Sequence, residues 1–217
     1  MKDELSISKP QNKRFSWAID ETKYLDLKRV RKLRRACSQA KDKALEKNKI
    51  VPVRDWFTVE LGLFTGLRVK EIADLEVSTL HVKENQSSLT VKRGKGNRTR
   101  TVYLSKVFKE ECLFYLDWKR NAIPQSDYLF TNTGGRPVTK RALQKAFKKC
   151  LTLAGLETHY SIHCLRHTYG SFLYKSSGHN LRLVQEQLGH SSIRTTQVYA
   201  SLMNEDVKKA VEKLYQE

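Results

Sequence analysis

The sequence of 217 residues has little of what marks secreted, disulfide-bonded or membrane proteins. Its four cysteines are widely spaced and form no Cys-x-x-Cys pair, which favours reduced thiols over a disulfide framework or a zinc knuckle. No apolar run reaches the length of about 18 residues that a membrane span needs. The N-terminal segment MKDELSISKPQNKRF lacks the hydrophobic stretch of a secretory signal. We therefore expect a cytoplasmic protein without a membrane partner.

Acidic residues are also scarce compared with basic ones. The chain has 41 Lys and Arg against 23 Asp and Glu, a formal net charge of +18. A surface with this excess attracts polyanions such as nucleic acid, although a merely basic soluble protein is the simpler alternative. Apolar residues make up 39% of the chain, which is enough for the core of one large domain.

Most of the chain has the apolar spacing of α-helices. Residues 26–48 and 52–64 are expected to form two long helices, with Gly66 as the stop of the second, and residues 68–75 a short one. Residues 1–19 are polar and contain Pro10, and we expect a flexible leader there. The first long helix carries many Lys and Arg, which suits either a solvated surface or a phosphate backbone. Further helices are expected at 105–119, 139–154, 162–175, 180–188, 192–200 and 205–216.

Between these helices the apolar period changes from 3.6 to 2. Residues 79–83, 88–92 and 100–104 are expected to form three short strands, the last two joined by a turn that contains Gly94 and Gly96. The fold class that we predict is therefore α+β, mostly helical, with one small three-stranded antiparallel sheet.

Four short stretches carry residues suited to phosphate chemistry. They are TGLRVKEI at 65–72, RGKGNRTR at 93–100, HCLRH at 163–167, and LGH at 188–190, which is followed nine residues later by Tyr199. A free tyrosine has a pKa near 10, so a nucleophilic tyrosine starts with a handicap of about 4 kcal/mol at pH 7. Negative charge also builds on the phosphate oxygens during attack, and arginine, which is always charged and forked, suits its neutralisation.

In order and spacing these stretches resemble the tyrosine recombinase family, which includes phage integrases, Xer-type recombinases and conjugative transposon integrases. The resemblance covers about residues 20–217 and implies the family's catalytic-domain fold. It also implies site-specific cleavage and rejoining of double-stranded DNA through a 3′-phosphotyrosyl intermediate, without a cofactor or metal. The protein would be a monomer when free and a homotetramer on DNA, in the nucleoid of a bacterial or phage-host cytoplasm. Family members commonly carry a helical DNA-clamping domain first, for which residues 1–19 leave no room.

The resemblance also implies a role for each matched residue. Tyr199 would be the nucleophile, Lys95 would protonate the leaving 5′ oxygen, and Glu71 would support the first arginine. His163 would either assist proton transfer from Tyr199 or contact the phosphate, a choice that the sequence leaves open. The scissile phosphate would be bound by Arg68, Arg166 and His190, and the flanking DNA backbone by Arg93, Arg98 and Arg100.

Helical spacing gives an expectation for residues 162–175 in particular. Ile162, Leu165, Tyr169, Phe172 and Leu173 form an apolar stripe that should pack inward and leave His163 and Arg166 at the rim of a cleft. Residues 204–217 show a second stripe, of Val207, Ala210, Val211 and Leu214, on a helix that packs on its own domain or docks on a neighbouring protomer.

Three alternatives compete with this interpretation. His159, His163, Cys164 and His167 cluster locally and suit a structural zinc site, but Cys164 stands where a zinc protease has its glutamate, and we expect no metal. A type IB topoisomerase shares the chemistry but reseals the same strand. A DNA-binding protein without catalysis would be expected to have lost Tyr199 or an arginine.

Overall fold

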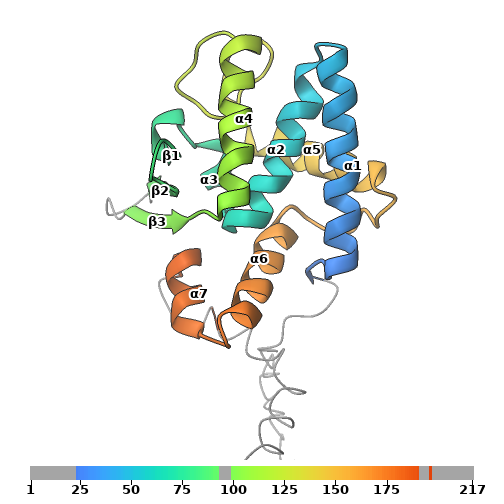
Figure 1. Ribbon diagram of the computed structural model, residues 1–217. Coiled ribbons are helices and arrows are strands. Elements are labelled where there is room, and N and C mark those ends of the chain that lie inside the picture. Colours follow the sequence, from blue (N-terminus) through green and yellow to red (C-terminus); the bar gives the residue numbers. More distant parts are fainter. Residues whose placement is uncertain (1–22, 93–98, 191–195, 197–217) are drawn as a thin grey trace, which may run out of the picture.

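The structure, a computed structural model, describes residues 23–92, 99–190 and 196. Its first two helices are α1 (Leu27–Glu46) and α2 (Ile50–Thr65), which pack side by side (Figure 1). α1 begins at Asp26, whose side chain accepts a hydrogen bond from the Arg29 amide at 2.7 Å. The α1 residues that are buried, Val30, Leu33, Cys37 and Ala44, recur at the helical spacing that the sequence predicts for residues 26–48.

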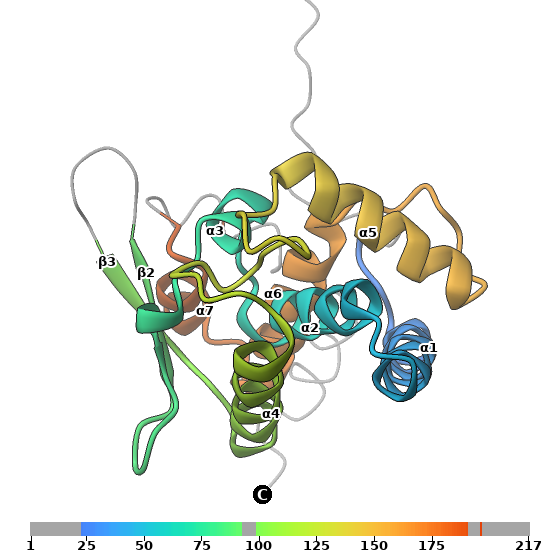
Figure 2. The same cartoon turned by 90° about the horizontal axis from the view of Figure 1, so that it is seen from above.

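α2 is the centre of the domain. Every residue from Val53 to Leu63 is buried, because α1, α4, α5 and α6 all pack against this helix. Figure 2, seen from above, shows α2 enclosed between α1, α4 and α6. The core is rich in aromatic rings: Phe57 of α2 stacks on Tyr115 of α4 with their centroids 3.9 Å apart, and Phe130 lies beside both.

A short helix and a small sheet follow α2. These are α3 (Val69–Ala73), the 3-10 helix η2 (Val77–Thr79), and strands β1 (Leu80–His81), β2 (Ser88–Lys92) and β3 (Thr99–Tyr103). The sheet is antiparallel with the order β1-β2-β3. Side chains of β2 and β3 alternate between buried and exposed, so that Leu89, Val91, Val102 and Arg100 face inward.

The remaining helices are α4 (Lys106–Ala122), α5 (Lys140–Leu153), α6 (His163–Ser176) and α7 (Leu181–Leu188). Ser105, Thr139 and Asn180 cap α4, α5 and α7 through their side chains. α7 packs on both α6 and β3, which places the end of α7 beside the sheet (Figure 1). Of the helices in residues 23–92 and 99–190, none is long and apolar enough to cross a membrane.

The predicted fold class is confirmed in the described residues, which form a mostly helical domain with one three-stranded antiparallel sheet. Most boundaries fall within three residues of the expected ones. The leader at 1–19 and the helices expected at 192–200 and 205–216 lie outside the described residues, apart from Thr196.

Candidate active site

Arg166 joins the two glycine-containing turns of the site. Its Nη1 donates to the carbonyl of Gly66 at 2.7 Å, and its Nη2 donates to the carbonyl of Leu188 at 2.9 Å. Gly66 ends α2 and Gly189 ends α7, both in the left-handed conformation that glycine adopts without a steric cost. A Cβ on Gly66 would also lie 2.5 Å from the Tyr169 ring. Two helix ends therefore meet on one guanidinium.

This arrangement corrects the expected position of Arg166. The sequence placed Arg166 with His163 at the rim of a cleft, whereas Arg166 is 6% exposed and His163 is exposed. The inward face of α6 mixes polar and apolar residues: Thr168 and Ser171 are buried together with Leu165 and Tyr174, while Phe172 and Leu173 are only partly buried. The guanidinium of Arg166 can be buried in this interior because two backbone carbonyls accept hydrogen bonds from its N–H groups.

Arg68 stands at the start of α3, two residues after Gly66. Glu71, in the first turn of that helix, accepts hydrogen bonds from the Arg68 amide at 2.8 Å and from its Nη1 at 3.1 Å. The hydrogen bond from the Arg68 amide to the Glu71 side chain is one of the two that make up a capping box. The Arg68 side chain is 43% exposed, so its guanidinium is available to an anion from solvent.

Arg100, expected to contact the DNA backbone, is turned inward and paired with groups of the protein. Its side chain is 7% exposed, and its Nη1 and Nη2 donate to the two Glu71 oxygens at 2.8 and 2.9 Å. Its Nε donates to the carbonyl of Gln187 at 3.3 Å. Alternation along β3 was the missed signal: Arg100 shares the inward face with Val102.

Burial works to raise the pKa of Glu71, but its arginine partners outweigh this effect. The hydrogen bonds and charge of Arg100, followed by the amide and charge of Arg68, lower the pKa to about 2. Glu71 therefore stays ionised at any pH at which the protein would work. Two arginines share one carboxylate, which leaves the cluster with a net positive charge.

His190 lies within the field of the three arginines. Burial, and then the charges of Arg166, Arg68 and Arg100, lower its pKa from 6.5 to about 3. Its Nδ1 is 3.0 Å from the hydroxyl of Thr196, which is fully buried. The imidazole is therefore neutral at pH 7, and its Nε2 can carry the hydrogen that a phosphate oxygen would accept.

His167 was not singled out for the site by the sequence, except as a candidate metal ligand. Burial lowers its pKa from 6.5 to about 4, and the charges of Arg166 and His163 act in the same direction. A half-buried histidine one turn after His163 looks like a packed residue in the sequence, so no local signal marks it. In the described part of the chain, no three His, Cys, Asp or Glu side chains lie close enough together to hold a metal ion.

Four of the expected functional residues lie outside the described residues. They are Lys95, the expected general acid; Tyr199, the expected nucleophile; and Arg93 and Arg98, the expected backbone contacts. The strands β2 and β3 on either side of residues 93–98 are described, and their register pairs Lys92 with Thr99. The structure thus brings together Arg68, Glu71, Arg100, Arg166 and His190.

The two depressed histidine pKa values predict how stability depends on pH. Between about pH 6.5 and pH 4 the unfolded chain binds protons that His167 and His190 do not bind in the folded state. The free energy of unfolding should therefore fall as pH drops through this range. In thermal melts, His190→Asn should show a shallower decline than the wild type. Burial raises the pKa of Glu60 to about 7, which makes the free energy of unfolding rise as pH drops, but this contribution is the same in the wild type and in His190→Asn. Equal slopes would contradict the placement of His190.

A comparison with protein families identifies the domain. The model of the "Phage integrase family" matches residues 23–206, most of the chain. This chain belongs to the phage integrase family. Among curated relatives, tyrosine recombinase XerC of Pseudomonas aeruginosa strain LESB58 is 37% identical over 149 residues, which are 69% of this chain and 48% of the relative. Tyrosine recombinase XerD of Lacticaseibacillus casei is 35% identical over 156 residues, 70% of this chain and 52% of the relative.

Solved structures of family members share the fold. The crystal structure of XerA recombinase superposes with a TM-score of 0.72 at 25% identity, covering 89% of this chain and 65% of that one. XerH site-specific recombinase bound to a palindromic difH substrate, in a post-cleavage complex, gives a TM-score of 0.71 at 28% identity, covering 90% and 54%. The expected recombinase catalytic-domain fold is confirmed. The chain spans about half the length of the curated relatives that it matches.

Proposed function

We propose that this chain is the catalytic part of a site-specific DNA recombinase that cleaves and rejoins DNA through a 3′-phosphotyrosyl intermediate. The observation that carries the proposal is the convergence of Arg68, Arg166 and His190 on the two glycine turns. Relatives named as tyrosine recombinases support it, as does a neighbour that is described in a post-cleavage complex with DNA.

The chemistry follows from what each residue supplies. The Tyr199 oxygen attacks the scissile phosphorus, the bond from phosphorus to the 5′ oxygen breaks, and a 3′-phosphotyrosyl bond forms. Lys95 gives its proton to the departing oxygen. Arg68 and Arg166 neutralise the charge on the nonbridging oxygens, to which His190 adds a neutral N–H donor. His163, exposed on the first turn of α6, either receives the tyrosine proton or contacts the phosphate.

Rejoining reverses these steps with a different strand. A 5′ hydroxyl from the partner duplex attacks the phosphotyrosine, and Tyr199 leaves with a proton. The phosphotyrosyl bond keeps the energy of the phosphodiester, so no ATP is consumed. The protein would work on double-stranded DNA in the nucleoid of a bacterial or phage-host cytoplasm, as a homotetramer that forms from free monomers on two duplexes.

The test is capture of DNA on the protein. A pool of duplexes with randomised sequence and a nick in one strand is incubated with the protein, and covalent complexes are isolated under denaturing conditions. Enrichment of one sequence in the captured pool is the expected result, because the nick lets the freed segment diffuse away and traps the intermediate. A pool that yields no covalent complex would contradict the proposal.

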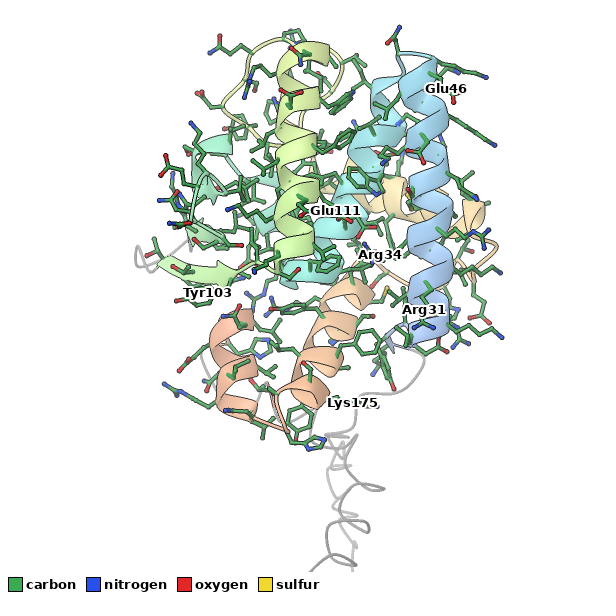
Figure 3. The ribbon with its side chains drawn as sticks, in the orientation of Figure 1. Arg31, Arg34, Glu46, Tyr103, Glu111 and Lys175 are labelled. Atoms are coloured by element: carbon green, nitrogen blue, oxygen red, sulfur yellow. The ribbon has the colours of Figure 1, made fainter. Side chains whose placement is uncertain are left out.

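Binding to DNA should weaken steeply as salt is added. The exposed cations of α1 and the basic residues of 92–98 are expected to contact several phosphates, each adding about −0.9 to the slope of log K against log salt. Fluorescence anisotropy at several salt concentrations measures the slope. Replacing α1 cations by Gln should make it shallower, and a wild-type slope near zero would show that the charge serves another partner. The α1 cations to replace are Lys28, Arg31, Lys32 and Arg35 (Arg31 is labelled in Figure 3).

Residues 204–217, which lie outside the described residues, have a predicted part in assembly. Their apolar stripe would dock on the neighbouring protomer, so a chain ending at residue 203 should stay a folded monomer that binds one DNA site. Cooperative synapsis and strand exchange should be lost, as native gels with one-site and two-site DNA would show. A truncated protein that aggregates or melts well below the full chain would instead indicate packing on its own domain.

A further inference from the structure

Arg68 and Arg100 share Glu71 unequally. Arg100 approaches the carboxylate with two nitrogens, one on each oxygen, whereas Arg68 uses only Nη1, at 3.1 Å. The Arg68 Nε and Nη2 have no hydrogen-bond partner among residues 23–92, 99–190 and 196. Of the guanidinium contacts to Glu71, the buried Arg100 therefore makes two and the exposed Arg68 makes one, while the Arg68 amide gives the fourth hydrogen bond that the carboxylate accepts.

Arg100 is held in this position from two other sides. It occupies an inward position of β3 opposite Val91, and its Nε donates to the carbonyl of Gln187 in the last turn of α7. The Gln187 side chain in turn accepts from the Tyr103 amide at 3.3 Å. The neighbouring carbonyl, of Leu188, accepts from Arg166. The guanidinium of Arg100 therefore links the sheet, α3 and the end of α7.

We propose that Arg100 is a positioning residue that occupies the Glu71 carboxylate and thereby keeps the Arg68 guanidinium available for the scissile phosphate. A carboxylate prefers a bidentate arginine partner. Without Arg100, Arg68 would be the only cation bonded to Glu71 among the residues that the structure describes, and it is three residues away on the same turn and can reach the carboxylate. A bidentate pair between these two would neutralise Arg68 and turn it away from the DNA. With Arg100 in place, two arginines and one carboxylate leave one positive charge for the substrate.

The inference rests on the proposed function and predicts a rescue that a purely structural role does not. The variants are Arg100→Gln, Glu71→Gln and the double change, which replaces the charged pair by two neutral amides of similar size. Gln at 71 keeps an oxygen for the Arg68 amide. Single-turnover cleavage is measured at saturating DNA, with thermal melts alongside. Arg100→Gln should slow cleavage by about 10-fold or more, the loss typical of one misplaced phosphate-stabilising group.

The double variant decides the question. Because it lacks the carboxylate that would capture Arg68, it should recover at least several-fold of the cleavage rate lost in Arg100→Gln. A double variant that is folded but no faster than Arg100→Gln overturns the inference, as does an Arg100→Gln protein that cleaves at the wild-type rate. If Arg100→Gln does not fold, Arg100→Lys replaces it: the ammonium binds Glu71 at a single point, so cleavage should still be slower than in the wild type, and an unchanged rate overturns the inference.

A matched control is present elsewhere in the domain. Arg34 of α1 binds Glu60 through Nε, at 2.7 and 3.0 Å from its two oxygens, and also binds Glu111 of α4 (Figure 3). Arg34→Gln removes a comparable arginine–carboxylate contact and should lower the melting temperature without changing the single-turnover rate. A wild-type protein that forms no covalent complex would defeat the proposed function itself. A wild type that forms one beside a fully active Arg100→Gln defeats only this inference.

Discussion

Tyr199→Phe is expected to abolish the covalent protein–DNA complex and leave DNA affinity nearly unchanged. The substitution removes one oxygen, the atom that would bond to phosphorus, while phosphate contacts elsewhere supply the binding energy. On a denaturing gel, captured DNA should migrate slowly with the wild type and at its free position with the variant. Anisotropy titrations of both proteins should give similar dissociation constants.

Matched tyrosine variants make this result specific. Tyr103 is exposed on β3 and Tyr128 is exposed beyond α4, and neither side chain is assigned a part in the chemistry. Phe at either position should leave the covalent complex intact. A Tyr199→Phe protein that still forms the complex would place the nucleophile on another residue.

Lys95→Ala is expected to slow cleavage of ordinary DNA by about 100-fold or more, the contribution of a general acid. The 5′ alkoxide is a poor leaving group and needs a proton as it departs. A substrate with sulfur at the 5′ bridging position has a good leaving group that needs little protonation. The variant should therefore cleave the sulfur substrate at nearly the wild-type rate.

The sulfur substrate separates two roles of Lys95. If the lysine only binds phosphate, as its basic neighbours were expected to do, the variant is impaired equally on both substrates. Arg68→Ala provides the comparison, because losing a phosphate-binding group should slow both reactions alike. Rescue of Lys95→Ala together with no rescue of Arg68→Ala assigns the acid role to Lys95.

Local patterns predicted the elements of this fold because each element buries one face. The apolar period of 3.6 marked residues 26–48, and α1 runs from Leu27 to Glu46. The change to a period of 2 marked the three strands, and the register of β2 and β3 follows from it. Gly66 was expected to end α2, and its left-handed conformation does so.

The organisation of the site depends on contacts that no local pattern contains. Arg166 is 100 residues from Gly66, and Arg100 is 29 residues from Glu71, yet both pairs are hydrogen-bonded. The motifs identified these residues as a set, but they did not show which arginine faces solvent. Arg166 and Arg100 can be buried because they donate hydrogen bonds to the carbonyls of Leu188 and Gln187. Every residue has a backbone carbonyl, so the sequence does not show which carbonyls accept these bonds.

The conformation of the backbone also explains why the site needs its glycines. A side chain at Gly66 would collide with Tyr169 and Leu188 in addition to straining the left-handed turn. The carbonyl that Arg166 holds belongs to this same residue. Close packing around Gly66 therefore requires a glycine at the end of α2. The guanidinium of Arg166 binds the carbonyls at the ends of α2 and α7 and so holds these two ends together.

The most direct test of the central claim is to determine which DNA end the protein carries and on which residue. DNA captured from the nicked pool is digested, and the protein is digested in turn and analysed by mass spectrometry. The account predicts a nucleotide joined through its 3′ phosphate to the peptide that contains Tyr199, and, on the segment released from the nicked strand, a free 5′ hydroxyl that polynucleotide kinase can label without prior phosphatase. Attachment through a 5′ phosphate, or to a residue other than Tyr199, would contradict it.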